Sequence, residues 1–326
     1  MIKLADGFLD GEERCGFFVP EMMKRTWAAE MEMVRLFGDF LDHLQIPWFI
    51  QYGTLLGAVR HQGFIPWDDD MDLAVFRSGY EKLLSHIDEL PKELRILSIY
   101  TEEDYRWTRA VLSNDLHRKL SWDEKRMDRF FGCPFIVNID IDILDHIPRD
   151  PEKQRIQKLL FNLAYTLIDR LVALEDAARS GEKEDEKLRQ EFEQGLGQLR
   201  DYLASFFGNA VTIRPDRPLK NELCRAADFI ASIGRPEESE YLDYYPHMIY
   251  TAEGPWQRAE WFEETVQLPF ECMELPAPAG YDCWLSRCYG KDFRTNMVRG
   301  AAHNYPFYAK QEEYFRFLGY LPQNGS

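Results

Sequence analysis

This 326-residue sequence lacks several common motifs and targeting signals, and each absence argues against one class of protein. The six cysteines form no CxxC pair, so we expect reduced cytosolic thiols rather than a zinc site. No run of 18 apolar residues suggests a membrane span, and the N-terminus lacks the apolar stretch of a signal peptide. We therefore expect a cytoplasmic protein with no stable membrane anchor, which contacts the inner face of the membrane at most transiently.

Positive charge is also scarce. The 39 Lys and Arg residues are outnumbered by 56 Asp and Glu residues, which gives a net charge of −17. This balance argues against a broad electrostatic surface for nucleic acid or anionic lipid, and we expect no nucleic-acid partner. A small nucleotide can still be bound locally through backbone N–H groups, a few cations and a metal ion.

Helix and strand patterns alternate in the first half of the chain. Residues 21–44 place apolar side chains at helical spacing between two prolines, which predicts one helix. The apolar runs 48–52 and 71–76 predict strands. Residues 135–144 alternate isoleucine with Asn or Asp, which is typical of a strand with two different faces.

From Pro151 the pattern becomes mainly helical, beginning with a strongly amphipathic stretch. We therefore predict an α/β protein with a mixed-sheet core over residues 1–150. Residues 151–326 are expected to form a mainly helical part and a C-terminal element that packs on this core.

Four carboxylates crowd the segment "WDDDMDL" just before an apolar run: Asp68, Asp69, Asp70 and Asp72. If the segment enters a strand, Asp68, Asp70 and Asp72 share one face and Asp69 points to the other. Two carboxylates that converge to about 4 Å repel by about 4 kcal/mol at an effective dielectric near 20. Such a face is stable if the acids are protonated, reach water, or share a cation, and Mg²⁺ suits the last case.

Two simpler interpretations compete with a metal site. One is a solvated acidic loop. The other is a calcium loop, but counting from Asp68 places Leu73 where an EF-hand needs glycine and Gly79 where it needs glutamate.

The residues around the acidic run favour a functional site. A strand and the Gly53–Thr54 turn precede a short helix, whose N-terminus can face a phosphate and for which Thr54 is a candidate cap. Asp140 and Asp142 lie on a later predicted strand and can supply a third metal ligand. A Gly-Ser/Thr turn, a D-x-D strand and a distant aspartate together are the signature of the nucleotidyltransferase fold.

The stretch "YGTLLGAVRHQGFIPWDDDMDL", from Tyr52 to Leu73, closely resembles the defining motif of the LicD family, which includes the fukutin-related proteins. Three further stretches are similar to family elements: "ERCGFFVPEMMKRTWAAEMEM", "FIVNIDIDILDHIP" and "LPFECMELPAPAGYDCWLSRCYGKDF". The resemblance therefore covers roughly residues 12–150 and 268–293. One departure is Asp142-Ile143, where the family commonly has Phe-Pro. Asp140 is therefore the better match to the family's aspartate.

The resemblance implies a nucleotidyltransferase-like fold and a Mg²⁺- or Mn²⁺-dependent transferase. The implied reaction moves a phosphorylated alcohol, with phosphocholine as the first choice, from a CDP-linked donor such as CDP-choline to a glycan hydroxyl, releasing CMP. The acceptor would be a cell-surface glycan such as lipopolysaccharide or teichoic acid, or its precursor. Two alternatives stay open: a true nucleotidyltransferase that moves NMP from an NTP to a small molecule, and a non-catalytic nucleotide-binding relic.

In the implied site Asp70 and Asp72 bind the metal. Asp140 either completes the metal site or takes the proton from the acceptor hydroxyl. Asp68 is either a further ligand or a neighbour that orients one, and Asp69 is expected to be structural.

Phosphate binding is assigned to the Gly53–Thr54 turn and to Arg60, for which a surface ion pair is the alternative. His61 would position phosphate, act as an acid, or make a structural hydrogen bond. Arg109 and Lys119 are weaker phosphate candidates, and Trp67 either stacks on a base or closes the core. If the cargo is choline, an aromatic cage is expected. The candidates for it are Trp107, Trp122, Tyr245, Trp256 and Trp261.

Overall fold

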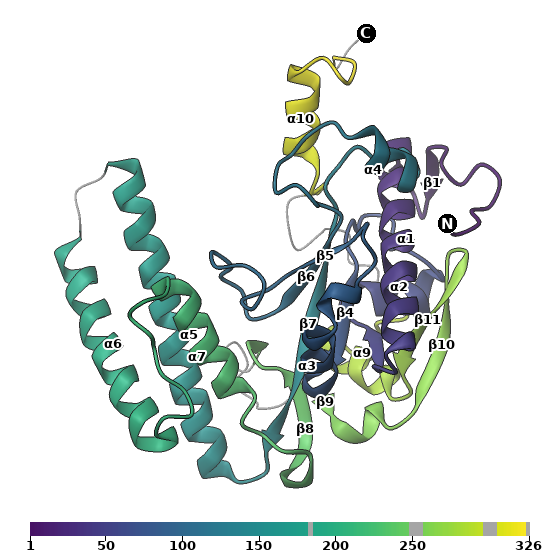
Figure 1. Ribbon diagram of the computed structural model, residues 1–326. Coiled ribbons are helices and arrows are strands. Elements are labelled where there is room, and N and C mark those ends of the chain that lie inside the picture. Colours follow the sequence, from purple (N-terminus) through teal and green to yellow (C-terminus); the bar gives the residue numbers. More distant parts are fainter. Residues whose placement is uncertain (182–184, 248–256, 296–304, 324–326) are drawn as a thin grey trace. The chain divides into compact units, whose positions relative to one another are not determined.

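The computed structural model, shown in Figure 1, describes residues 1–181, 185–247, 257–295 and 305–323. It contains both helices and strands throughout, which confirms the predicted α/β class. The chain forms two compact units, while the domain boundary expected at residue 150 stays a prediction. The first unit consists of Met1–Ile96, Val111–Asp142 and Glu260–Ser326, and the second of Leu97–Ala110 and Ile143–Ala259.

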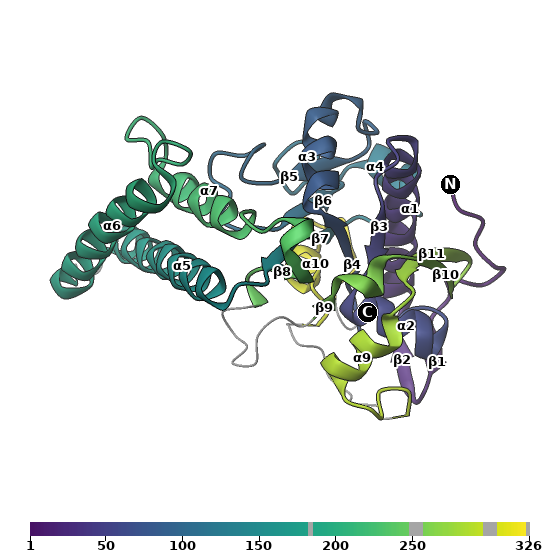
Figure 2. The ribbon, with the colours of Figure 1, turned by 90° about the horizontal axis from the view of Figure 1, so that it is seen from below.

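The first unit combines helices with short strands. Its helices are α1 (Glu21–His43), α2 (Tyr52–His61), α3 (Arg77–Ser85), α4 (Glu124–Arg129), α9 (Tyr281–Tyr289) and α10 (Ala309–Phe317), with short 3-10 turns at η1 (Ile87–Glu89) and η3 (Ala259–Phe262). Two hairpins belong to it, β1 (Glu12–Arg14) with β2 (Phe17–Val19) and β10 (Thr265–Phe270) with β11 (Met273–Pro278). α9 lies beside α2 (Figure 2). The rings of Tyr52 and Trp284 meet edge to face between these helices.

The main sheet places strands that are distant in sequence next to one another. Its order is β3-β4-β7-β6-β5, formed by β3 (Trp48–Ile50), β4 (Asp72–Phe76), β7 (Asn138–Pro148), β6 (Ala110–Ser113) and β5 (Arg95–Leu97). β7 continues into the second unit, where β8 (Ser239–Tyr244) pairs with it and β9 (Gln257–Arg258) pairs with β8. The central position of β7 beside β4 brings the two acidic segments of the sequence together.

The antiparallel register of β3 and β4 determines which side chains share a face near the site. Ile50 lies opposite Leu73, and one step further the N–H of Gln51 donates to the carbonyl of Asp72 at 3.0 Å. Residues directly opposite on paired strands point to the same face of a sheet. Gln51 and Asp72 are therefore neighbours on one face.

Helix α1 agrees with the helix predicted for residues 21–44 and carries much of the apolar core of the first unit. It starts directly after Pro20, and its buried side includes Met23, Trp27 and Val34. The indole N–H of Trp27 donates to the carbonyl oxygen of Asp68 at 3.1 Å. The same helix that forms the core therefore holds one end of the acidic segment.

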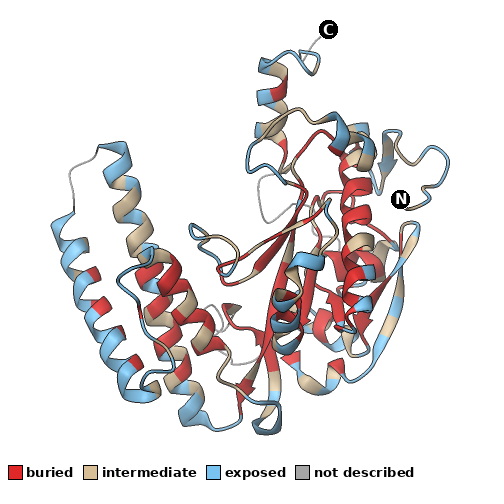
Figure 3. Ribbon diagram, in the orientation of Figure 1, coloured by how far each residue is buried: buried red, intermediate tan, exposed pale blue. Residues whose placement is uncertain are grey.

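The second unit contains a separate helical core. Its helices are α5 (Pro151–Ser180), α6 (Glu186–Phe207) and α7 (Leu219–Ala231), with a 3-10 turn at η2 (Pro236–Glu238). Asp150 and Asp185 cap the N-termini of α5 and α6 by accepting from backbone N–H groups. α6 is buried along one side and exposed along the other (Figure 3). Among the helices that the structure describes, none is long and apolar enough to cross a membrane.

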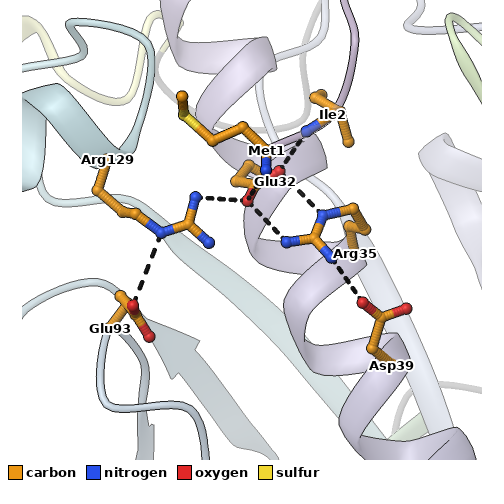
Figure 4. A network of polar contacts seen from close by, with 7 residues as sticks. All are labelled: Met1, Ile2, Glu32, Arg35, Asp39, Glu93 and Arg129. Carbon is orange, nitrogen blue, oxygen red and sulfur yellow. Dashed lines mark hydrogen bonds and ion pairs between the residues drawn. The ribbon is translucent and has the colours of Figure 1, made fainter.

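A buried carboxylate on α1, that of Glu32, is surrounded by donors (Figure 4). Arg35 and Arg129 donate to Oε1 at 2.9 and 2.6 Å, the backbone N–H of Ile2 donates to Oε2 at 2.7 Å, and the amino group of Met1 lies 3.6 Å away. Burial alone would raise the pKa of Glu32, but these hydrogen bonds lower it from 4.5 to about 2. The charged form of Glu32 therefore stabilises the folded state.

Replacing Glu32→Gln should reduce the free energy of unfolding at pH 7 by about 2–3 kcal/mol. Because the folded-state pKa lies below the unfolded-state value, this stabilisation is complete above pH 4.5 and is lost as the pH falls towards 2. Urea unfolding of both proteins at several pH values measures the difference. Glu152→Gln, which breaks an exposed pair with Arg155, should change little. A difference between wild type and Glu32→Gln that persists at pH 2 would contradict this assignment.

Candidate active site

The acidic segment is a loop rather than the start of a strand. β4 begins only at Asp72, so the prediction that Asp68 and Asp70 alternate along it is wrong. The loop instead turns the carboxylates of Asp68, Asp69 and Asp70 towards one another, with one oxygen of each within 4.8 Å of the others. Alternation along a strand would have sent Asp69 away from this group.

Asp68 and Asp69 are each fixed by a different part of the chain. Asp69 is fully buried, and its Oδ2 accepts the backbone N–H of Phe307 at 2.6 Å. Asp68 lies against the first turn of α2, where a Cβ atom on Gly53 would be 2.5 Å from Asp68 Oδ2. Glycine at position 53 thus leaves the space that the Asp68 carboxylate occupies.

Asp72 has other carboxylates around it. Burial raises its pKa well above the ordinary value, and the charges of Asp70, Asp142, Asp140 and Asp68 raise it further, in that order. The structure therefore brings Asp68, Asp70 and Asp140, each a predicted metal residue, into electrostatic reach of Asp72.

Asp140 and Asp142 reach this position from β7. They are two residues apart on the strand and therefore share a face, as the sequence predicts. Asp140 is half-buried, whereas Asp142 is only 4% exposed. The sequence left the role of Asp142 open, and the structure places it in the interior beside the predicted site.

The first turn of α2 differs in detail from the prediction. The N-cap position is Gln51, and no side chain caps the helix, so the prediction that Thr54 is the cap is wrong. Thr54 Oγ1 instead accepts the backbone N–H of Asp72 at 2.8 Å and ties α2 to β4. Tyr52, next to Gly53, has a φ of 41°, a left-handed conformation that is uncommon for a residue with a side chain. Such backbone strain is found mainly at functional sites.

Two buried polar residues near the acids were missed at the sequence level. Neither amide atom of Gln51 and neither carboxylate oxygen of Glu30 hydrogen-bonds to a residue that the structure describes, and both side chains are fully buried. Burial raises the pKa of Glu30 well above its ordinary value, and the charges of Asp70, Asp69 and Asp68 add to the shift. Glu30 could have been noticed as an acid three residues after Trp27, on the apolar side of its helix.

His61 and Arg60 end α2 in a partly buried environment. Arg60 Nη1 donates to the carbonyl of Phe293 at 3.4 Å, and burial lowers the pKa of Arg60. Burial, together with the charges of Arg60 and Arg14, lowers the pKa of His61 to about 4. His61 is therefore neutral at pH 7, which argues against a role as a general acid. A role as a hydrogen-bonding residue is consistent with the neutral form. Trp67 is buried and meets His61 edge to face, so core packing is the role observed for it.

The remaining phosphate and cage candidates differ in their exposure and packing. Lys119 is exposed, and Arg109 is half-buried. Among the proposed cage residues, Tyr245 packs on Phe161 in the helical core and Trp122 stacks on Tyr320, while Trp256 lies outside the described residues.

The donor set fits a hard divalent cation. Mg²⁺ and Mn²⁺ prefer carboxylate oxygens, and these are the groups gathered around Asp72. An unsatisfied buried amide such as that of Gln51 costs about 1–3 kcal/mol, so its presence here indicates a partner outside the residues that the structure describes. Asp70, Asp72, Asp140 and Asp68 remain the proposed metal residues.

Because Gly53 lies close to Asp68, we expect alanine at position 53 to lower the stability of the protein, opposite to its usual effect in a helix. Replacing glycine by alanine inside a helix normally stabilises by about 1 kcal/mol. Gly53→Ala should instead destabilise by about 1–3 kcal/mol, because the new methyl group overlaps the Asp68 carboxylate. Gly197→Ala, in α6 with open space around the position, is the control and should stabilise. Thermal and urea unfolding measure both, and a stabilised Gly53→Ala variant would contradict the close approach.

The lowered pKa of His61 gives a second prediction. His61→Gln should leave the shape of the pH–activity profile between pH 6 and 8 unchanged, because the imidazole stays neutral there. Since the folded-state pKa lies below the unfolded-state value, wild type should lose stability relative to His61→Gln as the pH falls from 6.5 towards 4. NMR titration of the imidazole gives its pKa directly, and a midpoint near 6.5 would refute the buried neutral state.

Comparison with known proteins agrees with this geometry. Residues 45–166, which include all six aspartates of the candidate site, match the family model described as LicD/FKTN/FKRP, nucleotidyltransferase domain. A curated protein named lipopolysaccharide cholinephosphotransferase LicD, from Haemophilus influenzae, is 26% identical over 145 residues, covering 40% of this chain and 49% of that protein.

Two uncharacterized rickettsial proteins match over shorter stretches. The one from Rickettsia typhi is 37% identical over 65 residues (19% of this chain, 21% of that protein), and the one from Rickettsia prowazekii is 54% identical over 37 residues (11% and 14%). The matched part spans about half of the LicD relative and less of the other two. The resemblance to the LicD family is thereby confirmed over residues 45–166, which match the family's nucleotidyltransferase domain.

Proposed function

We propose that this protein is a metal-dependent transferase that moves a phosphorylated alcohol from a CDP-linked donor to a hydroxyl of a cell-surface glycan or its precursor, releasing CMP. Phosphocholine is the first candidate for the transferred group, because the Haemophilus influenzae relative is named a lipopolysaccharide cholinephosphotransferase. The donor would then be CDP-choline and the acceptor a lipopolysaccharide sugar or a similar glycan.

One observation carries this proposal: a half-buried aspartate at the start of β4 on which the charges of four other aspartates act, within a LicD-type domain. Crowded carboxylates of this kind are stable when they share a divalent cation. A relic that had lost its chemistry would have little reason to keep such an unfavourable arrangement. The cluster therefore favours an enzyme over a non-catalytic binding protein.

In the proposed reaction the acceptor oxygen bonds to the phosphorus that carries the alcohol. The bond from this phosphorus to the bridging oxygen breaks, and CMP leaves with that oxygen. A bound Mg²⁺ or Mn²⁺ would neutralise charge on the pyrophosphate. Asp70 and Asp72 are the proposed residues that hold the ion. Asp140, half-buried on β7, would either complete the metal site or take the acceptor's proton.

The start of α2 has two tasks in this scheme. Thr54 Oγ1 accepts the backbone N–H of Asp72. This hydrogen bond fixes the position of a proposed metal ligand relative to α2. The N-terminus of α2 presents the positive end of the helix dipole, which favours a phosphate nearby. Arg60 is the proposed cation at the other end of this helix.

The leaving group distinguishes this proposal from its main alternative. The purified protein should be incubated with CDP-choline, CDP-ribitol, CTP or ATP in the presence of Mg²⁺ and a lipopolysaccharide acceptor. Release of CMP together with transfer of the alcohol phosphate is the expected result. Release of pyrophosphate from CTP or ATP would instead identify a true nucleotidyltransferase.

Two variants connect the assay to the site. Asp72→Asn should reduce the transfer rate by at least a hundredfold, because it removes a proposed metal ligand. Asp39→Asn is the control, since Asp39 is an exposed residue of α1 that pairs with Arg35. Full activity in Asp72→Asn, or activity unaffected by EDTA, would refute the metal-dependent mechanism.

A further inference from the structure

We propose that Asp142 is itself a ligand of the divalent cation, and that Gln51 positions the Asp72–Asp142 pair through its side-chain amide. This inference rests on the metal dependence in the proposed function and extends the metal site by two residues. Asp140 is the family match on this strand, whereas Asp142 and Gln51 are assigned from the geometry of this chain.

The position of Asp142 is the first argument. It shares a face of β7 with Asp140, and β7 lies directly next to β4, which begins at Asp72. Asp142 is the more buried of the two acids on this face, at 4% exposed. Asp142 therefore lies on the strand next to Asp72, on the same face of β7 as Asp140.

Burial of the Asp142 carboxylate near other carboxylates costs free energy. A carboxylate removed from water and placed beside like charges is destabilised unless a cation or strong donors compensate. A shared divalent ion removes this penalty for Asp72 and Asp142 together. The ligands would then come from two adjacent strands, whose hydrogen-bonded ladder fixes their separation.

Gln51 is an independent observation that also points to a ligand. Its side chain is fully buried, and neither its amide oxygen nor its amide nitrogen hydrogen-bonds to any residue within the described ranges. The register of β3 and β4 places it opposite Asp72 and on the same face. A primary amide can donate to a metal-bound carboxylate through its nitrogen and accept from a metal-bound water through its oxygen. Such outer partners orient metal ligands in many proteins.

Titration with Mn²⁺ alone, followed by electron paramagnetic resonance of the free ion and by calorimetry, tests the assignment without substrate or turnover. Asp142→Asn should weaken Mn²⁺ binding at least tenfold. The same substitution should raise the melting temperature of the metal-free protein, because it removes one of the carboxylates that repel one another. It should also reduce the increase in melting temperature that Mn²⁺ causes. Asp39→Asn, the exposed control on α1, should match wild type in all three measurements.

The second variant, Gln51→Met, keeps the size of the side chain but removes both hydrogen-bonding atoms. We expect about tenfold weaker Mn²⁺ binding, which lies in the range of losses seen when outer partners of metal ligands are removed. The metal-free protein should remain folded and at least as stable, because a buried amide without a partner is replaced by an apolar group. A residue that only packs would leave Mn²⁺ affinity unchanged.

The outcomes separate this inference from the proposed function. Mn²⁺ affinity within twofold of wild type in Asp142→Asn overturns the ligand role while leaving transfer chemistry intact. If Asp142→Asn does not fold, unchanged affinity in Gln51→Met overturns the proposal instead. If wild type does not bind Mn²⁺, both the proposed function and the ligand role of Asp142 are refuted. If wild type binds Mn²⁺ but releases no CMP, only the proposed function is refuted.

Discussion

Mutual repulsion of the carboxylates around the start of β4 is the interaction on which the first unit depends. Asp68, Asp69 and Asp70 converge within one loop, and Asp72 follows at the first residue of the strand. Each like-charged pair at about 4 Å costs about 4 kcal/mol at an effective dielectric near 20. A loop left to itself would separate these side chains into water. The surrounding protein must therefore hold them together, and the shared cation that we propose would offset the repulsion.

The restraints on the loop come from widely separated parts of the chain. The indole of Trp27 on α1 holds the carbonyl of Asp68, and Thr54 on α2 holds the N–H of Asp72. The backbone of Phe307 donates to Asp69 from the C-terminal region. Because these contacts involve the backbone as well as side chains, they fix the loop geometry whether or not a ligand is bound. A preorganised site of this kind loses little entropy when an ion or a phosphate binds.

The C-terminal hairpin supports the same site from the other end of α2. Glu271, between β10 and β11, accepts from the backbone N–H of Phe64 at 3.1 Å and pairs with Arg14 through both of its oxygens. The backbone N–H of Glu271 donates to the carbonyl of Gln62 at 2.7 Å. The connection between α2 and the acidic loop is thus held by a residue some 200 positions later. This explains physically why segments near both termini belong with the α/β elements in one compact unit.

The sequence by itself predicted the fold class, several main helices and strands, and the family. The α1 helix, β7 and α5 follow from apolar periodicity, and the acidic run with the glycine-rich stretch before it identified the family. Periodicity is a local property, so it could not show that β4 begins only at Asp72. Only the tertiary structure, by pairing β3 with β4 and β4 with β7, decided that Gln51 and Asp142 are neighbours of Asp72. Neighbours across a sheet are set by strand order and register, which depend on contacts between residues far apart in the chain.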